Sequence, residues 1–429
     1  MGDRARSAAR GNFELGQRSP IITPSVPLVI PSPKRHRRPI PPVRVASLAQ
    51  DTAKHDLGGT LRDREASRTL ARIRPLLPRF GITRVANVTG LDRIGIPVWM
   101  CIRPNGHSLS VSQGKGITPE LAQVSAIMES IELFHSEHVR DPDLIGSFRD
   151  TKRSHKVLDP GDLAPGVSWR AYSHSRKIGW MRGTELVGGD SLLVPHVRLK
   201  LNYSEPHPEG GLLALSSTGL ASGNHPSEAL CHAVFEVIER DCEWRWGRMS
   251  TAAQRATELD EKSVRSPMLH RLLDQLAAAE ISVRMWDMTS KVGIPAFRCT
   301  VTETGPIARS GPFAGNGCHL SAEIALSRAL TEAAQSRLTY IAGSRDDIYP
   351  ATYQAMNSLE HRPSASRPTR HFEERPSVPL GATFEEDLQA TFQLLGAAGF
   401  RRIVAVDLTQ SEFGIPVVMV LIPGMREED

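Results

Sequence analysis

Three segments of this chain each carry two small residues followed by a pair of acidic or amide side chains at a fixed spacing. The pattern is alanine, three residues, alanine, two residues, glutamate, two residues, then glutamate or glutamine. It occurs as Ala122, Ala126, Glu129 and Glu132, as Ala229, Ala233, Glu236 and Glu239, and as Ala325, Ala329, Glu332 and Gln335. Residues three and four apart share a helix face. The pattern therefore predicts three helices, each with a small-residue patch for close packing and polar side chains one to two turns further on.

The acids of these segments lie among apolar residues such as Ile131, Val237 and Leu330 rather than among lysines. A carboxylate in semi-buried surroundings costs several kcal/mol, roughly, unless a cation meets it. Mg²⁺ prefers carboxylate oxygens and usually brings phosphates with it. The alternative is that the acids are ordinary surface residues of amphipathic helices, but the threefold recurrence favours a metal site.

A glycine-rich segment precedes each acidic helix, at Ser112–Gly116, Thr218–Asn224 and Ala314–Gly317. These segments are interpreted as loops whose backbone N–H groups, at the start of a helix, can bind phosphate. Lys115 is followed by Gly116 rather than Ser or Thr, so the Walker pattern is absent, and no Gly-x-Gly-x-x-Gly motif is present. From its residues alone, the chain is predicted to bind phosphate and Mg²⁺ at a non-Walker site.

A second repeat is a glycine-x-proline turn that opens a run of apolar residues, at Gly95, Gly293 and Gly414. Proline is tolerated at the first position of a strand, so each copy predicts a strand start. The first two copies lead into a glycine-rich segment and a helix, which makes a repeated strand, loop and helix unit. The fold class predicted is α/β (α+β). These turns alone are also compatible with a purely architectural role.

Length and composition are compatible with this fold. A chain of 429 residues is long enough for one large or two medium α/β domains. It contains no apolar run of transmembrane length and no apolar signal-peptide core, so a cytoplasmic location is expected. The five cysteines have neither CxxC nor zinc-ligand spacing, which excludes a recognisable zinc motif. Cys318 beside His319 is compatible with a nucleophile, but no second motif supports that role.

The positive charge is concentrated near the N-terminus. Residues 1–48 have nine Arg or Lys against two acids, a net charge of +7 that leaves −2 for the remainder of the chain. Eight prolines lie between Pro20 and Pro42. Residues 1–48 are therefore predicted to be a disordered arm and residues 49–429 the folded domain, with an exposed loop near 358–380.

At these motifs the chain resembles the YcaO family. The resemblance rests on Ser112-x-Gly-Lys-Gly with Glu129 and Glu132, on Ala221-Ser-Gly-Asn224 with Glu236 to Asp241, and on Ser327 to Arg337. Lys54 and Gly59-Thr-Leu-Arg62 are similar to the opening motif of the family, so the resemblance covers roughly 54–424. It implies the YcaO-like fold around a non-Walker ATP site, with ATP and Mg²⁺ as cofactors.

The resemblance also implies roles for single residues. Four glutamates are implied to bind Mg²⁺, namely Glu129, Glu132, Glu236 and Glu239. Six residues are implied to bind nucleotide or to lie beside the metal, namely Lys54, Asn224, Glu228, Arg240, Arg328 and Glu332. Leu133 stands where many relatives have arginine, which leaves one expected basic contact missing. No catalytic residue is assigned.

Members of this family use Mg-ATP to phosphorylate a peptide backbone amide oxygen in the biosynthesis of modified peptides. Residues 335–347 and 414–424 look like the branch associated with TfuA proteins, which implies a thioamide product. Azoline formation by a cyclodehydratase is the alternative, and a non-catalytic nucleotide-binding adaptor is a rival from another class. The expected partners are a peptide or protein substrate, a TfuA-like protein, a separate peptide-recognition protein and a second copy of the chain. Neither a membrane nor a nucleic acid is expected as a partner.

Deletion of residues 1–48 should leave the melting temperature and the ATP affinity nearly unchanged, because a segment rich in proline and charge buries little apolar area. Thermal unfolding and nucleotide titration of the truncated chain would measure both. A large drop in melting temperature would show that the arm packs on the body.

Overall fold

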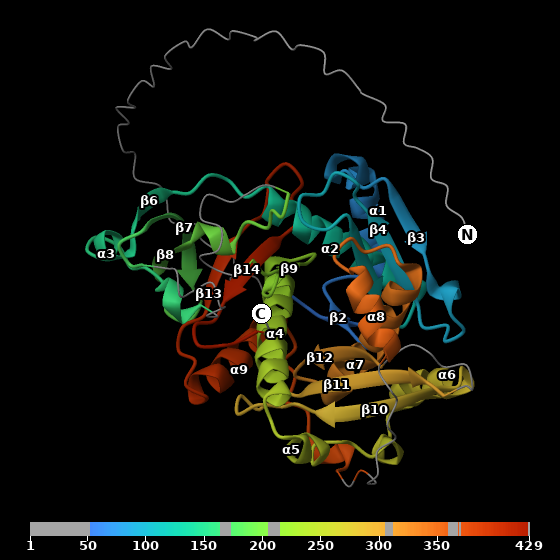
Figure 1. The fold of residues 1–429 in the computed structure, drawn as a ribbon. Coiled ribbons are helices and arrows are strands. Elements are labelled where there is room, and N and C mark those ends of the chain that lie inside the picture. Colours follow the sequence, from blue (N-terminus) through green and yellow to red (C-terminus); the bar gives the residue numbers. More distant parts are fainter. Residues whose placement is uncertain are drawn as a thin grey trace, which may run out of the picture. The chain divides into compact units, whose positions relative to one another are not determined.

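The computed structural model in Figure 1 describes residues 52–163, 173–204, 215–304, 312–358, 368 and 370–427. The arm expected at 1–48 lies outside the described residues, so its boundary stays a prediction. In the loop expected near 358–380, most of the described residues are exposed. Two of its side chains are nevertheless anchored, because Arg370 and Arg375 pair with Asp287 at 3.1 and 2.9 Å.

Each of the three glycine-x-proline turns opens a strand, which confirms that prediction. The strands are β4 (Val98–Ile102), β11 (Ala296–Glu303) and β14 (Val417–Leu421). Gly95, Gly293 and Gly414 have φ values of 78°, 81° and 62°, in the left-handed region that favours glycine. The proline then directly precedes the strand, where it removes no ladder hydrogen bond.

Each of these strands is the middle strand of an antiparallel set of three. The sets are β3 (Arg84–Asn87), β4 and β5 (Val111–Lys115); β10 (Ile281–Asp287), β11 and β12 (Phe313–Cys318); and β13 (Val404–Asp407), β14 and β9 (Leu220–Ser222). β9 lies far before β13 and β14 in the sequence, so this set forms only when the middle of the described chain meets its C-terminal part. Its sheet continues through β7 (Lys177–Glu185) to β6 (Leu144–Ser147) and β8 (Ser191–Pro195).

An acidic helix follows the edge strand of each set, as predicted. The helices are α2 (Pro119–Glu137), α4 (Pro226–Gly247) and α7 (Ala322–Ala342). Proline at the first position of α2 and α4 has a φ suited to a helix start. Thr118 and Ser321 cap α2 and α7 by accepting hydrogen bonds from backbone N–H groups of the first turn.

The first and third glycine-rich segments are strands, so their interpretation as loops is wrong, whereas in the second only Leu220–Ser222 is strand and the residues on either side form turns or loops. Gly114 lies in β5, and Gly315 and Gly317 lie in β12. A Cβ atom on Gly114 would lie 2.0 Å from the backbone nitrogen of Ala126, and one on Gly315 would lie 2.2 Å from that of Ala333. The glycines are therefore required because the strand backbone touches the helix backbone, where the small alanines leave room.

The three helices also connect the three sets to one another. α2 packs against β9, α4 against β12 and α7 against β5, so each acidic helix contacts the edge strand of another set. This order closes a ring. The acidic faces of all three helices consequently lie near one another, around the middle of the ring.

The remaining elements are the short strands β1 (His55–Asp56) and β2 (Leu61–Arg62) and the helices α1 (Ala66–Ile73), α3 (Phe148–Thr151), α5 (Thr251–Arg255), α6 (Pro267–Ala278), α8 (Pro350–Ser358) and α9 (Phe384–Ala397). Most of them lie around this ring, whereas β2 lies toward its middle, between α4 and α8 (Figure 1). The fold is mixed α/β, as predicted. Among the described residues, no helix is long and apolar enough to cross a membrane.

Gly114→Ala should lower the free energy of unfolding by about 2–3 kcal/mol or more, because the added methyl group meets helix backbone that cannot move aside. Gly396→Ala is the matched control, since a Cβ atom at Gly396 meets nothing within 4 Å in α9. Gly396→Ala should leave the free energy of unfolding unchanged or raise it by about 0.5–1 kcal/mol. Urea unfolding of both variants tests the prediction, and equal effects would contradict the packing role of Gly114.

Candidate functional site

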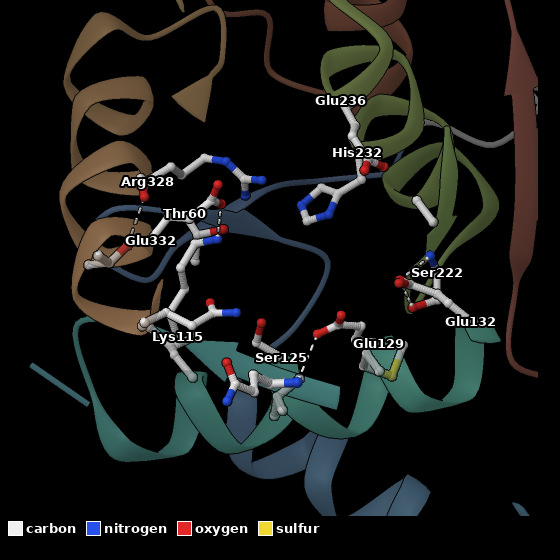
Figure 2. Close-up of a pocket in the computed structure, with 18 of the residues that line it drawn as sticks. Thr60, Lys115, Ser125, Glu129, Glu132, Ser222, His232, Glu236, Arg328 and Glu332 are labelled. Atoms are coloured by element: carbon white, nitrogen blue, oxygen red, sulfur yellow. Dashed lines mark hydrogen bonds and ion pairs between the residues drawn. The ribbon is translucent and has the colours of Figure 1, made fainter. Parts of the chain in front are cut away.

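A cavity of about 740 Å³ occupies the middle of the ring. Residues of all three edge strands and all three acidic helices line it. Figure 2 shows Glu129, Glu236 and Arg328 reaching into it from different helices. Its volume falls within the range of about 300–1,000 Å³ that is usual for ligand pockets.

One contact recurs in all three sets. In each helix, the first acid of the repeated pattern accepts a hydrogen bond from a backbone N–H at the edge strand of its own set. Gln113 N donates to Glu129 at 3.0 Å, Gly219 N to Glu236 at 3.3 Å, and Asn316 N to Glu332 at 3.2 Å. The short distance between strand and helix backbones makes this contact possible, and it orients the three carboxylates along the cavity wall.

Two further contacts connect different sets. Glu132 of α2 accepts hydrogen bonds from the backbone N–H and the hydroxyl of Ser222 in β9, both at 2.7 Å. Lys115 of β5 pairs with Glu332 of α7 at 2.5 Å. Figure 2 shows both contacts at the cavity wall. The same polar groups that line the cavity therefore also hold the ring closed.

Burial dominates the acid–base behaviour of the glutamates in the first two helices. It raises the pKa of Glu132 to about 8 and that of Glu236 to about 7. Burial also raises the pKa of Glu129 and of Glu239. A carboxylate with a raised pKa lacks enough positive charge around it. These four glutamates therefore have too little positive charge around them.

The third helix differs in its charge balance. Burial acts to raise the pKa of Glu332, but Lys115 and Arg240 outweigh it and hold that pKa at about 2. The position three residues later is Gln335, a neutral cavity residue. The shortage of positive charge is therefore confined to the acids of α2 and α4.

Two arginines that the sequence analysis selected line the cavity. Arg240 lies among glutamates, and although burial opposes this, Glu239, Glu332 and Glu236 raise the pKa of its guanidinium. The Arg328 Nε atom is buried and has no hydrogen-bond partner among the described residues. A buried guanidinium nitrogen without an acceptor suits an anionic ligand such as phosphate.

Asn224 and Glu228 are also brought to the cavity wall. Glu228 is 1% exposed and accepts hydrogen bonds from Asn224 N and Asp63 N, both at 3.2 Å. It also pairs with Arg62 at 3.2 Å. Since the carboxylate has several partners already, its contacts suit a residue that orients the loop around Asn224.

Lys54 is the one selected residue that the structure does not bring to the cavity lining. Its ammonium group pairs with Asp387 at 2.5 Å, and both side chains are nearly fully buried. Removing Lys54 from this pair would leave Asp387 buried without a partner, which is costly. The ion pair with Asp387 gives Lys54 a structural contact, and the phosphate contact that the resemblance implied for Lys54 stays a prediction.

Sequence reasoning missed three residues of the cavity lining. His232 accepts a hydrogen bond from Arg62 at 2.7 Å, and burial lowers the pKa of His232 well below its usual value, so its ring is neutral. Lys115 was considered as part of a Walker-like motif and of the Ser112-x-Gly-Lys-Gly motif without a role of its own, and Arg345 only as part of a longer run. His232 follows Glu228 by four residues on the same helix face, a signal that could have found it.

The metal-binding prediction can be compared with the positions of the acids. Among the described residues, no group of three or more His, Cys, Asp or Glu side chains could hold a metal ion alone. Mg²⁺ is usually held by one or two carboxylates together with substrate phosphates. Paired acids short of positive charge, beside the unpartnered Arg328 nitrogen, fit a cation that arrives with a phosphate ligand.

The nucleophile interpretation of Cys318 gains no support. All five cysteines are buried. Burial raises the pKa of the Cys318 thiol and lowers the pKa of His319 to about 3. A reactive cysteine needs a lowered pKa and some exposure. The thiol is therefore expected to be inert.

Comparison with known proteins identifies relatives of the chain. The family model described as YcaO cyclodehydratase, ATP- and Mg²⁺-binding, matches residues 113–426. A protein in the tfuA 3′ region of Rhizobium leguminosarum bv. trifolii is 35% identical over 84% of this chain and 87% of its own length. A protein of Methanothermobacter thermautotrophicus is 32% identical over 84% of this chain and 94% of its own.

Two solved structures share the fold. YcaO from Methanopyrus kandleri, bound with AMPPCP and Mg²⁺, has a TM-score of 0.67 at 22% identity and covers 86% of this chain and 93% of its own. A heterocyclase in complex with substrate and cofactor has a TM-score of 0.72 at 20% identity. That likeness covers 88% of this chain but about half, 54%, of the heterocyclase.

In the presence of a chelator, the free energy of unfolding should fall as the pH rises from about 5 to 9. Glu132 and Glu236 have folded-state pKa values of about 8 and 7, above the ordinary value of 4.5. The folded protein thus keeps protons that the unfolded chain releases, and this stabilisation is lost as the pH rises through the folded pKa. Each group contributes at most about 1.4 kcal/mol per pH unit.

Urea unfolding across this pH range measures the slope. Glu132→Gln should flatten it, whereas Glu373→Gln, at an exposed position, should leave it unchanged. The same slope in the wild type and in Glu132→Gln would contradict the effect of burial on this carboxyl group.

Proposed function

This chain belongs to the YcaO family, and we propose that it uses Mg-ATP to phosphorylate a peptide backbone amide oxygen, giving a thioamide with a TfuA-like partner. The observation that carries the proposal is the cavity itself. Buried acids short of positive charge face arginines, one of which has a buried nitrogen without a partner in the part of the chain that the structure describes. Such an arrangement matches a ligand that brings divalent cations and phosphates together.

We assign the Mg²⁺ ligands to Glu129, Glu132, Glu236 and Glu239, whose surroundings leave them short of positive charge. Mg²⁺ supplies charge neutralisation to the transferred phosphoryl group. Arg240 and Arg328 would contact phosphate oxygens, and Glu332 would orient Lys115 through their ion pair. Asn224, fixed by Glu228, would lie beside the nucleotide or the metal.

The reaction follows from the poor leaving ability of an amide oxygen. Hydrosulfide adds to the amide carbon, and the oxygen of the adduct takes the γ-phosphoryl group while ADP departs. The C–O bond then breaks with loss of phosphate, the sulfur loses its proton, and C=S forms. Charge on the transferred group develops in a cavity whose cationic side chains are already in place, which lowers the barrier. We assign His232 no role as a proton carrier, because burial holds its pKa well below the usual value and the ring stays neutral.

The tfuA-region relative favours the thioamide branch. The description of the family model favours the alternative, a cyclodehydratase that forms azolines at Cys, Ser or Thr. In that reaction the side chain of the substrate takes the place of hydrosulfide and the same phosphorylation follows. A non-catalytic nucleotide-binding adaptor is a third candidate, separated from both by ATP turnover that depends on a peptide. A separate peptide-recognition protein and self-association of the chain remain part of the proposal.

The product distinguishes the two chemistries. With Mg-ATP, sodium sulfide, a TfuA-like protein and peptides encoded near its gene, the enzyme should raise the peptide mass by the difference between sulfur and oxygen. Cyclodehydration instead lowers the mass by one water. Mass spectrometry separates these outcomes because they differ in sign. A product lighter by one water, formed without sulfide, would reject thioamidation.

Glu239→Gln serves as the control for the site. Because this change removes one metal carboxylate, ATP turnover and product should both be lost while the fold is retained. Circular dichroism checks the fold. Turnover at the wild-type rate in this variant would reject the assignment of Glu239 to the metal.

A further inference from the structure

One end of the cavity opens onto a cluster of aromatic and aliphatic side chains, which we call the tyrosine rim. It consists of Tyr203, Tyr340, Ile341, Ile348 and Tyr349. Aromatic residues make up only 5% of the chain, and it has five tyrosines, three of which lie between residues 340 and 353. Tyrosine and arginine are enriched in binding surfaces, where a rigid ring supplies contact area at a low entropy cost.

The rim runs from the inside of the cavity to the surface. Tyr340 and Ile348 line the cavity, together with Phe313. Ile341, Tyr203 and Tyr349 are 39%, 55% and 67% exposed. Single exposed apolar residues are normal on a protein surface. Here, however, Ile341 and Tyr349 directly follow the lining residues Tyr340 and Ile348 in the sequence, so a ligand in the cavity could reach them.

Hydrogen bonds hold the loops of the rim together. Ser110 N donates to Asp346 at 3.1 Å, which joins the β4–β5 loop to the loop after α7. Tyr203 N donates to His107 O at 2.8 Å, which joins a third loop to the first. Partial burial and the Asp347 carboxylate raise the pKa of the Tyr203 phenol, which places Tyr203 near the loop after α7.

The rim is continuous with the chemical part of the cavity. Arg345 pairs with Asp347 in the loop after α7, and its charge also acts on Glu129, one of the proposed metal ligands. Arg345 and Glu129 both line the cavity. A group held at the rim is therefore close to the site at which we propose that phosphoryl transfer occurs.

A polar group at this end also lacks a partner. Gln113 is 2% exposed and lines the cavity, and one end of its side-chain amide contacts Thr339. The other end of the same amide has no hydrogen-bond partner among the described residues. A buried amide group without a partner is costly, and a peptide backbone offers both a donor and an acceptor to satisfy it.

We propose that the tyrosine rim binds an aromatic or large aliphatic side chain of the peptide substrate, next to the amide that is modified. This inference rests on the proposed function, because it specifies the substrate of the same site. A peptide is the occupant that fits best, since its side chain suits the apolar rim and its backbone suits Gln113. The nucleobase of ATP and a partner protein are outcomes that the experiment separates.

The experiment measures peptide binding without turnover. Fluorescein-labelled hexapeptides of sequence Ala-Ala-Phe-Cys-Ala-Ala and Ala-Ala-Gly-Cys-Ala-Ala are titrated with the full chain, Mg²⁺ and AMPPCP, and anisotropy gives the affinities. The phenylalanine peptide should bind about tenfold more tightly. Tyr349→Ala should weaken its binding about fivefold to tenfold and leave the glycine peptide and AMPPCP unaffected. Tyr349 is largely exposed, so the change should not impair folding.

Ile145→Ala is the matched control. Ile145 is 69% exposed, like Tyr349, but it lies on β6, on the opposite side of the view in Figure 1 from α8. It should bind both peptides as the wild type does. Equal affinity for the two peptides, or no binding of the phenylalanine peptide up to about 1 mM, would overturn the inference.

Two other results would assign the rim differently and so also overturn the inference. A loss of AMPPCP affinity in Tyr349→Ala would assign the rim to the nucleobase. Unchanged peptide binding with a loss of binding to the TfuA-like protein would assign it to the partner. In either case the proposed function survives, because it is tested separately by the mass of the product and by the dependence of ATP turnover on a peptide.

Discussion

Direct contact between strand backbone and helix backbone is the constraint on which the rest of the structure depends. Glycines in β5 and β12 lie against alanines in α2 and α7 at a distance that no side chain on the strand would permit. This closeness lets the first acid of each helix reach a backbone N–H of the strand. It also brings each helix near the edge strand of another set. The cavity and its acidic lining follow from this packing.

The positive groups of the protein do not fully balance the acids that line the cavity. Burial raises the pKa of Glu132 and Glu236, since too little positive charge surrounds them. Lys115 supplies that charge to Glu332, and a neutral glutamine stands at the last position of the third copy. The third copy of the repeat therefore differs from the other two in its charge. In the function that we propose, the acids of α2 and α4 would therefore hold the divalent cations, and the cationic side chains of the cavity would contact phosphate.

The two ends of the cavity have different chemistry. Acids and guanidinium groups meet at one end, where a phosphoryl group can be transferred in surroundings that need little reorganisation. The tyrosine rim provides apolar contact area at the other end, with Arg345 between them. The residues that would carry out the reaction and those that would recognise the peptide can therefore change independently of each other within one fold. That separation offers a physical reason why related chains could modify different peptides with the same phosphorylation step.

The sequence alone determined the local features. Helical spacing predicted α2, α4 and α7, because residues three and four apart share a face whatever surrounds them. The glycine-x-proline turns predicted three strand starts, because the positive φ at glycine and the ring of proline act within a few residues. The acids were selected by the same spacing, whereas Arg240 and Arg328 were selected by the family resemblance, and all of them line the cavity.

Only the tertiary structure decided the features that depend on distant residues. Lys54 meets Asp387 across most of the described chain, and β9 pairs with β14 across about half of it. The glycines of β5 and β12 serve helix packing, which no local pattern distinguishes from a loop. Arg62 and His232 become partners in the same manner. Such contacts depend on which surfaces meet when the ring closes, and spacing along the chain carries no record of that.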